Sequence, residues 1–454
     1  MKLSTRVLGV VYQFSSLKEV FAKANEEKSG DRLAGIAAET VQERIAAKQV
    51  LSDITLAEIR DNPLLPAEED EVSRIIEGDI NEPVYQKIKN WSVAELRETI
   101  LNDKTTSEDL KRLSRGLTSE MIAAAAKLMS NLDLVHAAGK IEILTKCNIT
   151  IGQRGVLASR LQPNHPTDNV EGMIASLKEG LSYGVGDAVI GINPVDDSVE
   201  SVKRLLHATH DFIEEWQVPT QNCVLAHVTA QMKAIKQGAP ADMIFQSIAG
   251  TEAAHRSFGI TASLIAEADE LAKTYGTGTG PQRLYFETGQ GSELSAEAHH
   301  GIDQMTLESR NYGFARHYDP YIVNTVVGFI GPEYLYDNKQ VMRAGLEDHF
   351  MAKMHGVPMG VDICYTNHIK ADQNDIENLG VLLSAAGVNF IIAAPMGDDV
   401  MLNYQSMSYH DIATLRQTMN KKPAPIFAEW LEKMGIYENG RLGERAGDPT
   451  IFTR

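Results

Sequence analysis

Short apolar runs in the second half of this sequence end in polar side chains that could bind a small polar molecule. Glu287 closes the run Leu-Tyr-Phe-Glu before a turn with Gly289 and Gly291, and Asp362 lies in a similar run, Gly-Val-Asp-Ile-Cys. A buried carboxyl group without partners is destabilising by on the order of a few kcal/mol. A cluster of such groups is therefore more consistent with a functional site than with chance. Two carboxylates in one cavity would suit a cationic substrate or general acid–base catalysis. The structural alternatives are a helix cap or an arginine pair for Glu287 and a backbone hydrogen bond for Asp362.

Arg160 and Gln162 form a second candidate pair in the segment Ser-Arg-Leu-Gln-Pro-Asn. Pro163 predicts that this segment is extended or loop rather than helix interior. Alternate side chains of an extended chain face the same way, so we expect Arg160 and Gln162 on one side and Leu161 on the other. A solvated surface charge is the alternative for Arg160.

From about residue 148 onward, apolar β-branched runs alternate with amphipathic segments. The runs predict eight strands: 148–152, 188–195, 223–228, 243–248, 284–288, 322–330, 361–366 and 390–395. A strand-then-helix repeat predicts parallel strands joined by right-handed crossovers. Eight such units in roughly 270 residues match an α/β fold of the TIM (β/α)8 barrel class, and a doubly wound open sheet is the competitor.

Polar residues near the ends of these runs favour the barrel, because strand ends converge on one mouth there. They are Asn193, His227, Gln246, Glu287, Asp362 and either Asp398 or Asp399. The chain is therefore divided into a mainly helical region (1–147), a barrel with its active site at the C-terminal ends of the strands (148–420), and a C-terminal helix and tail (421–454).

Helix-start signals support the helical assignment of the first region. Capping boxes, in which a Ser or Thr and a Glu three residues later bind each other's backbone N–H groups, are predicted at three places, and a further helix should follow Thr118. The three pairs are Ser16/Glu19, Thr55/Glu58 and Ser92/Glu95.

Composition excludes several classes of protein. The 454 residues include 43 Lys and Arg against 61 Asp and Glu, a net charge of −18, which disfavours a nucleic-acid partner. Neither a complete dinucleotide or phosphate-loop motif nor a run long enough to span a membrane is found. The three cysteines fit no metal or redox motif, and with the lack of a leader pattern they predict a soluble cytoplasmic protein. Cys364 is expected to point away from Asp362 as a bystander.

Longer runs are more specific than any of these short motifs. They are Ser-Arg-Leu-Gln-Pro-Asn (159–164), Gly-Leu-Ser-Tyr-Gly-Val-Gly-Asp-Ala-Val-Ile-Gly-Ile-Asn-Pro-Val (180–195), Tyr-Phe-Glu-Thr-Gly-Gln-Gly-Ser (285–292), Arg-Asn-Tyr-Gly-Phe-Ala-Arg-His-Tyr-Asp-Pro (310–320), Asn-Thr-Val-Val-Gly-Phe-Ile-Gly-Pro-Glu-Tyr-Leu-Tyr (324–336) and Arg-Ala-Gly-Leu-Glu-Asp-His-Phe-Met (343–351). These runs closely resemble the large subunit of ethanolamine ammonia-lyase. The likeness extends from residues 11–14 to residues 445–449, which is essentially the whole chain.

The resemblance implies an adenosylcobalamin-dependent enzyme that converts ethanolamine to acetaldehyde and ammonia. It implies a TIM barrel with a helical N-terminal extension, and a small subunit that supplies part of the cobalamin site. A 5′-deoxyadenosyl radical would take hydrogen from the hydroxyl-bearing carbon before the amine migrates or leaves, and the protein would supply placement and electrostatics. It also implies a large hetero-oligomer of both subunits and allows residence in a bacterial microcompartment.

Site residues follow from the resemblance position by position. The substrate contacts fall on Arg160, Leu161, Gln162, Asn193, Glu287 and Asp362, and of these Arg160, Glu287 and Asp362 are expected to be catalytic. The cobalamin contacts fall on Pro194, Gln246, Ser295 and Met401. No protein ligand to cobalt is expected, since the segment 133–139 carries one residue too many for the Asp-x-His-x-x-Gly motif and the family keeps the nucleotide base on the metal.

Two other functions remain open at this point. The chain could be a barrel lyase or isomerase that acts on a small amine without cobalamin, or a silent scaffold that organises a complex. The intact set of Arg160, Glu287 and Asp362 counts against the scaffold.

Overall fold

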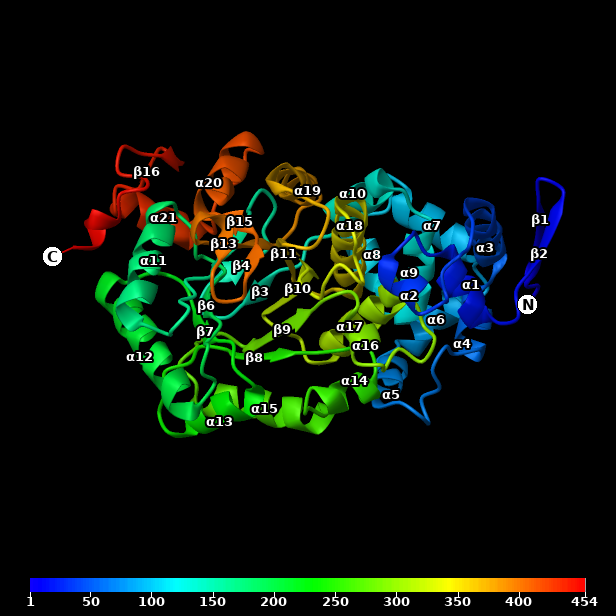
Figure 1. Cartoon of the computed structure of the whole chain (residues 1–454), viewed down its shortest axis with the longest axis horizontal. Coiled ribbons are helices and arrows are strands. Elements are labelled where there is room, and N and C mark those ends of the chain that lie inside the picture. The colour runs from blue at the N-terminus through cyan, green and yellow to red at the C-terminus, as the bar shows by residue number, and fades with distance from the viewer. Residues whose placement is uncertain (454) are drawn as a thin grey trace.

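Eight parallel strands form a barrel at the centre of the computed structural model, which describes residues 1–453 (Figure 1). The strands are β5 (Ala158–Leu161), β6 (Val189–Ile192), β7 (Asn222–Val224), β8 (Ile244–Ser247), β9 (Leu284–Thr288), β10 (Ile322–Gly328), β11 (Met359–Thr366) and β12 (Phe390–Ala394). Hydrogen bonding orders them β7-β6-β5-β12-β11-β10-β9-β8. Most of their residues are buried, as the near-continuous apolar runs predict. The predicted TIM-barrel fold is thus confirmed.

Seven of the eight predicted strands are present, and the first prediction is wrong. The run 148–152 contains only β4 (Thr150–Ile151), which pairs antiparallel with β3 (Thr145–Lys146) outside the barrel ladder. The first barrel strand is β5, which carries Arg160 and pairs with β12 and β6. The sequence pattern did not predict β5 because it contains the polar Ser159 and Arg160 and is followed by Pro163. Both polar side chains are nevertheless buried.

One seam of the barrel is closed by side chains. Within the described residues no backbone ladder joins β7 to β8. Asn222 and Asp242 each accept the other's backbone N–H at 2.9 Å near the N-terminal ends of these strands. Gln246 Oε1 accepts the N–H of Val228 at 3.0 Å toward the other end. These paired amide and carboxyl groups complete the ring where backbone bonding stops.

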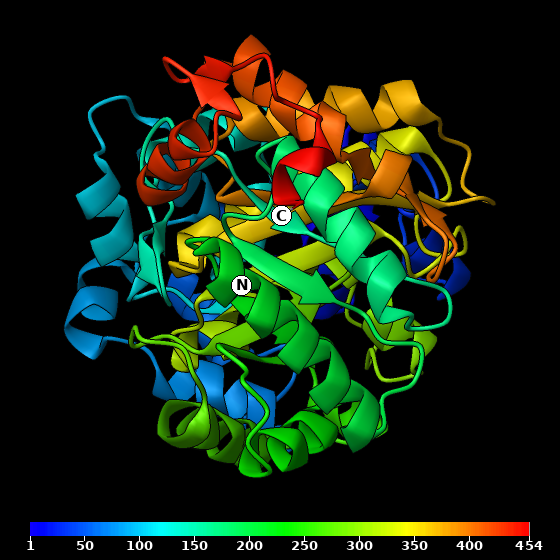
Figure 2. The same ribbon diagram turned by 90° about the vertical axis from the view of Figure 1, so that its left-hand side faces the viewer.

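Helices on the outside of the barrel join successive strands (Figure 2). Their bounds are α11 (Val170–Ser182), α12 (Val199–Trp216), α13 (Val228–Lys236), α14 (Glu252–Ser257), α15 (Ala262–Tyr275), α16 (Ser292–Ser295), α17 (Gln304–His317), α18 (Asn338–His355), α19 (Gln373–Ala385) and α20 (Tyr409–Thr418). After β12 the chain forms the short pieces η1 (Pro395–Gly397), β13 (Asp398–Asp399), β14 (Tyr404–Gln405) and β15 (Met407–Ser408), which attach to β11 and β12. This segment therefore lies at the C-terminal ends of the strands, which we call the mouth of the barrel.

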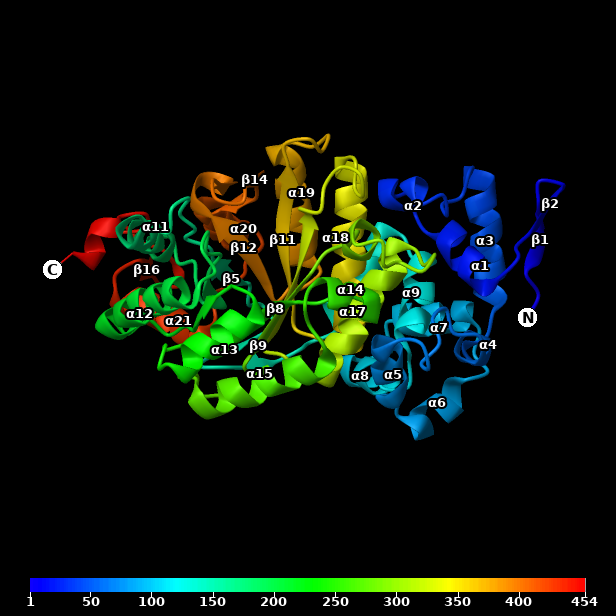
Figure 3. The same ribbon diagram turned by 60° about the horizontal axis from the view of Figure 1, so that its bottom comes forward.

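The N-terminal region is helical after a projecting hairpin of β1 (Ser4–Val7) and β2 (Val10–Gln13) (Figures 1 and 3). Its helices are α1 (Leu17–Ala24), α2 (Ser29–Leu33), α3 (Val41–Asp53), α4 (Leu56–Asp61), α5 (Glu71–Gly78), α6 (Glu82–Ile88), α7 (Val93–Leu101), α8 (Ser107–Ser114), α9 (Ser119–Lys127) and α10 (Asn131–Lys140). The capping boxes that begin α4 and α7 and the helix after Thr118 are confirmed. At Ser16 only half of the box forms, because Glu19 binds Ser15 instead.

Buried ion pairs attach this helical region to α17 and α18 of the barrel. Lys28 Nζ lies 2.8 Å from Glu347 Oε2, and Lys127 Nζ lies 2.6 Å from Asp303 Oδ1, with all four side chains fully buried. Arg310 in α17 also pairs with two carboxyl groups of the N-terminal region. The two parts are therefore joined through charged groups that water does not reach.

The chain ends with α21 (Pro425–Lys433), the hairpin of β16 (Tyr437–Glu438) and β17 (Arg441–Leu442), and η2 (Pro449–Phe452). Phe452 packs on Phe212 and Trp216 of α12, so the C-terminal segment lies against the outside of the barrel (Figure 2). No helix within residues 1–453 combines the length and apolar character needed to cross a membrane. The predicted three-part division of the chain stays a prediction.

Candidate functional site

Arg160 is the centre of a polar cluster at the mouth of the barrel. Although it is only 1% exposed, its guanidinium donates to Asn193 Oδ1 at 2.6 Å and to the Tyr285 hydroxyl at 2.7 Å. Arg160 Nη1 also lies 3.8 Å from Glu287 Oε2. The residues come from β5, β9 and the end of β6, so the barrel brings together side chains far apart in sequence.

Gln162 and Asp362 form the other half of the cluster and share the hydroxyl of Tyr404. Gln162 Nε2 donates to the Tyr404 oxygen at 2.7 Å, and Tyr404 in turn donates to Asp362 Oδ2 at 2.7 Å. Ser406 donates to Asp362 Oδ1 at 2.6 Å. Both oxygens of Asp362 are therefore held in place by hydroxyl groups from the segment after β12.

Glu287 is held more loosely than Asp362. Its side chain is 21% exposed, and its one hydrogen bond is from Asn324 Nδ2 at 3.3 Å. Asn324 Oδ1 is buried and has no hydrogen-bond partner. The Glu287 carboxyl group thus keeps free hydrogen-bonding capacity on the open side of the cluster.

The surroundings of this cluster shift the pKa values of its charged groups. Burial raises the pKa of Glu287 and of Asp362, and the nearby Arg160 guanidinium only partly opposes this. Burial works against the charge of Arg160 as well, but the neighbouring Tyr285 and Glu287 raise its pKa overall. A guanidinium beside two carboxyl groups that are costly to ionise is suited to a cationic ligand, which would stabilise both carboxylates.

Leu161 points outward and packs near Gly180 and Gly186, as the predicted alternation along β5 requires. Its side chain is outside the cluster, and its assignment as a substrate contact stays a prediction. Cys364 was expected to point away from Asp362, and this is wrong: two residues along β11 it shares the same side and packs with Val326 and Tyr404. Burial raises the pKa of its thiol well above the ordinary value.

Several polar residues of the cluster were not predicted as site residues. Asn164 follows the 160, 162, 164 alternation and could have been found by it. Tyr285 and Asn324 lie inside apolar strands, and Tyr404 and Ser406 come from a segment whose fold has no local signal. Asp399 was noted only as one of two polar strand ends, yet it accepts hydrogen bonds from both Gln162 and Asn164.

The four residues expected to contact cobalamin lie in or after elements on the mouth side of the barrel, and their contact with the cofactor stays a prediction. Pro194 follows β6, Gln246 lies in β8, Ser295 ends α16 and Met401 lies between β13 and β14. Large apolar side chains are also exposed after three strands of the barrel: Val195 follows β6, Phe329 follows β10, and Met396 and Val400 follow β12. An apolar rim around a polar floor suits a large flat ligand with polar edges. Within residues 1–453 no three His, Cys, Asp or Glu side chains gather in a way that could hold a metal ion.

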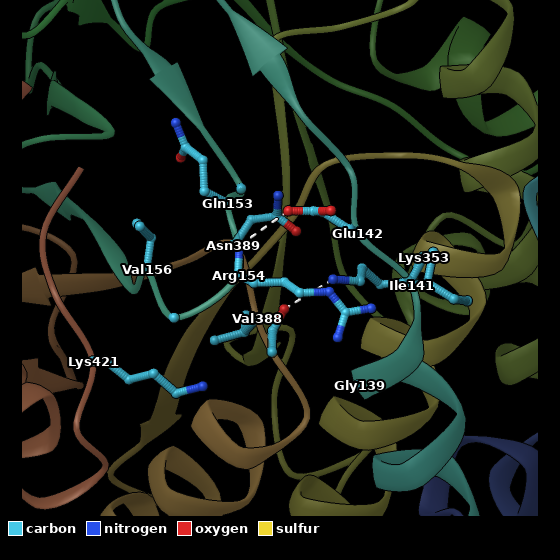
Figure 4. A pocket seen from close by; sticks show the side chains of 13 residues that line it. Gly139, Ile141, Glu142, Gln153, Arg154, Val156, Lys353, Val388, Asn389 and Lys421 are labelled. Atoms are coloured by element: carbon cyan, nitrogen blue, oxygen red, sulfur yellow. Dashed lines mark hydrogen bonds between the residues drawn. The ribbon is translucent and has the colours of Figure 1, made fainter. Parts of the chain in front are cut away.

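A cavity of about 160 Å³ lies at the opposite end of the barrel (Figure 4). Asn389, just before β12, and Val156, just before β5, line it together with Arg154 and Lys353. Burial lowers the pKa of Lys353 to about 7, and its amine donates to the Gly387 carbonyl at 2.9 Å. Active sites of such barrels lie at the C-terminal ends of the strands, so this cavity is separate from the candidate site.

Comparison with known proteins gives matches over the whole chain. A family model described as ethanolamine ammonia lyase large subunit (EutB) matches residues 12–445. The ethanolamine ammonia-lyase large subunit of Escherichia coli is 56% identical over 452 residues, and that of Salmonella typhimurium is 55% identical over 452 residues, each covering 100% of both chains. Among solved structures, a truncated 3-deoxy-D-arabino-heptulosonate 7-phosphate synthase from Thermotoga maritima covers 61% of this chain and 94% of its own, with 12% identity and a TM-score of 0.37, a likeness too distant to inform function.

Proposed function

Since the chain belongs to the ethanolamine ammonia-lyase large subunit family, and is thus an ammonia-lyase subunit, we propose that it carries out adenosylcobalamin-dependent radical deamination of ethanolamine to acetaldehyde and ammonia. The observation that carries this proposal is the polar cluster at the mouth of the barrel. It combines one guanidinium with the carboxyl groups of Glu287 and Asp362. A molecule with an ammonium group next to a hydroxyl group matches that combination.

Each side chain has a defined part in holding the substrate. The carboxylates of Glu287 and Asp362 offset the ammonium charge. Both Gln162 Nε2 hydrogens are taken by Asp399 and Tyr404, so its Oε1 is the end of the amide left to accept from the substrate. Asn193 Oδ1 is likewise occupied by Arg160, which leaves its amide hydrogens for the hydroxyl oxygen.

Arg160 and Glu287 are the groups that can respond as charge shifts during the reaction. The hydroxyl of a carbon radical is more acidic than that of the parent alcohol, and Arg160 can stabilise the developing negative charge on its oxygen. Glu287, with free hydrogen-bonding capacity, can stay bound to the amine while the amine moves between the two carbons. Asp362 is fixed by Tyr404 and Ser406 and supplies a stationary negative charge.

The residues at the mouth fit the cofactor. Pro194, Gln246, Ser295 and Met401, with the exposed apolar rim, would hold the corrin ring and its amide side chains, and a small subunit would cover the rest. When bound, adenosylcobalamin supplies the carbon-centred radical that removes hydrogen from the substrate. The chain offers the cavity and the charges that keep the reacting carbon near that radical. A hetero-oligomer with the small subunit, housed in a bacterial microcompartment, belongs to the same proposal.

The direct test is an anaerobic mixture of this chain, its small subunit, adenosylcobalamin and ethanolamine, examined by EPR. We expect paired signals from low-spin cobalt and an organic radical, together with acetaldehyde formation. Without ethanolamine or without the corrinoid, both should be missing. Turnover by the isolated chain without a corrinoid would instead favour a cobalamin-independent lyase.

The raised carboxyl pKa values predict an acid limb in the pH dependence of kcat/KM. Glu287 and Asp362 take up protons at a higher pH than the ordinary values of 4.5 and 3.8, and a neutral carboxyl group no longer attracts the ammonium. An alkyl ammonium titrates near pH 10, about as lysine does, so it stays charged throughout this range. Hence kcat/KM should fall as pH decreases through a value above 4.5. A profile that is flat down to pH 4.5 would contradict the assigned charges.

A further inference from the structure

We infer that Asp399 is a positioning residue that holds the substrate side and the cofactor side of the barrel mouth in one arrangement. The inference rests on the proposed function, because it concerns the substrate contacts Gln162 and Asn193 on one side and the cofactor contact Met401 on the other. No direct contact of Asp399 with substrate or cofactor is proposed. It acts through the groups that its carboxylate binds.

Four N–H donors converge on the Asp399 carboxylate, which is 2% exposed. Oδ2 accepts from Gln162 Nε2 at 2.6 Å and from Asn164 Nδ2 at 2.7 Å. Oδ1 accepts from the backbone N–H groups of Met401 at 3.1 Å and Leu402 at 2.7 Å. No Lys or Arg in residues 1–453 forms an ion pair with it. One carboxylate therefore ties β5 to the loop that follows β13, by uncharged donors alone.

The substrate side depends on Asp399 through two amides. Gln162 uses one hydrogen of its amide on Asp399 and the other on Tyr404, which determines which end of the amide faces the cavity. Asn164 donates to Asp399, while its Oδ1 accepts the backbone N–H of Asn193 at 2.8 Å. Asp399 thus orients Gln162 directly and Asn193 through Asn164.

The cofactor side depends on Asp399 because its carboxylate spans the short turn between β13 and β14, binding two of that turn's backbone N–H groups. Met396 and Asn403 adopt left-handed backbone conformations, with φ of 56° and 60°, a region that asparagine tolerates but methionine rarely enters. Val400 is 65% exposed. The Asp399 side chain, together with its carbonyl, which accepts the N–H of Asn403 at 2.7 Å, closes the turn that carries Met401.

Asparagine cannot replace Asp399 in this role. It has one acceptor oxygen, so its NH2 group would face a pair of N–H donors and repel them. Asp398 provides a matched control, because it lies next to Asp399 in β13 but is exposed, and within residues 1–453 its side chain binds only Gln405. The Asp399→Asn and Asp398→Asn variants therefore make the same chemical change one residue apart.

Hydrogen exchange on the complex of both subunits tests the inference without turnover. In Asp399→Asn, amides of the peptide 398–405 should exchange about tenfold faster than in the wild type, since a hydrogen bond to a charged group is lost. Asp398→Asn should exchange like the wild type. Unchanged exchange in Asp399→Asn, or equal acceleration in both variants, would overturn the inference even if the enzyme proves to be a cobalamin-dependent lyase.

A second measurement tests whether Asp399 couples the substrate contacts to the loop that carries Met401. Ethanolamine should slow exchange of the Met401 and Leu402 amides in the wild-type complex, and Asn164→Ala should weaken that protection. This measurement remains decisive if Asp399→Asn does not assemble, and protection that is lacking in the wild type contradicts the link. In turnover, Asp399→Asn should raise KM for ethanolamine about tenfold in the wild type but far less in a Gln162→Ala background, because the bond through which Asp399 acts is already missing there. Full additivity would show that Asp399 does not act through Gln162.

Discussion

Replacing Glu287 by glutamine should lower kcat of the assembled enzyme by at least about a hundredfold, which corresponds to roughly 3 kcal/mol of transition-state stabilisation. Glutamine has the same shape, so the loss reflects the charge that would follow the amine as it moves. KM should change less than kcat, since Asp362 still attracts the ammonium in the ground state. Steady-state kinetics with ethanolamine measures both. Near-normal kcat would refute the part assigned to Glu287.

Stability measurements can show that this loss does not come from misfolding. Because the folded-state pKa of Glu287 is raised, ionising it destabilises the wild type once the pH exceeds its ordinary value of 4.5. The neutral Glu287→Gln variant avoids this penalty, so its Tm should equal or exceed that of the wild type, with a difference that grows from pH 4.5 toward neutrality. Glu267→Gln, on the exposed face of α15, should change neither Tm nor kcat.

Replacing Asp362 by asparagine should lower kcat/KM by about a hundredfold, mainly through a higher KM. Tyr404 and Ser406 hold both oxygens of Asp362, so its charge cannot follow the amine and should contribute equally to bound substrate and transition state. Such uniform binding appears in KM. Glu287→Gln should therefore act mainly on kcat, whereas Asp362→Asn should act mainly on KM.

A milder variant checks this interpretation of Asp362. Ser406→Ala removes one hydrogen bond and leaves the charge, so it should raise KM by less than about tenfold. A Ser406→Ala variant as impaired as Asp362→Asn would mean that the orientation of this carboxylate, rather than its charge, governs binding.

Sequence patterns predicted the parts of this fold that depend on local chemistry. Seven barrel strands were found because burial on both faces makes them apolar throughout, and the capping pairs at Thr55 and Ser92 act within one helical turn. β5 was missed because a strand that carries a buried arginine has the composition of a loop. The error at Cys364 was avoidable, since strand alternation puts it on the side of Asp362.

Some residues of the candidate site could be predicted from local sequence, and others depend on tertiary packing. Arg160, Gln162, Glu287 and Asp362 stand out as polar residues beside apolar runs, and the structure brings them to one mouth. Tyr404 and Ser406 could not be predicted, because they reach Asp362 from about 40 residues further along the chain, through a segment whose path depends on pairing with β11 and β12. Such contacts depend on tertiary packing rather than on any local preference.

The buried ion pairs between the N-terminal helices and the barrel predict that the barrel cannot be trimmed to a minimal catalytic unit. Cutting away residues 1–147 would leave Asp303 without Lys127 and Arg310 without its carboxylates, while Glu347 would lose Lys28 and keep Arg343. Removing one partner of a buried pair typically destabilises a protein by about 3–5 kcal/mol, so losing several such pairs would cost about as much as the whole stability of an ordinary domain. We therefore expect the barrel to need the N-terminal region in order to fold, and efforts to transplant this active site should carry α1–α10 with it.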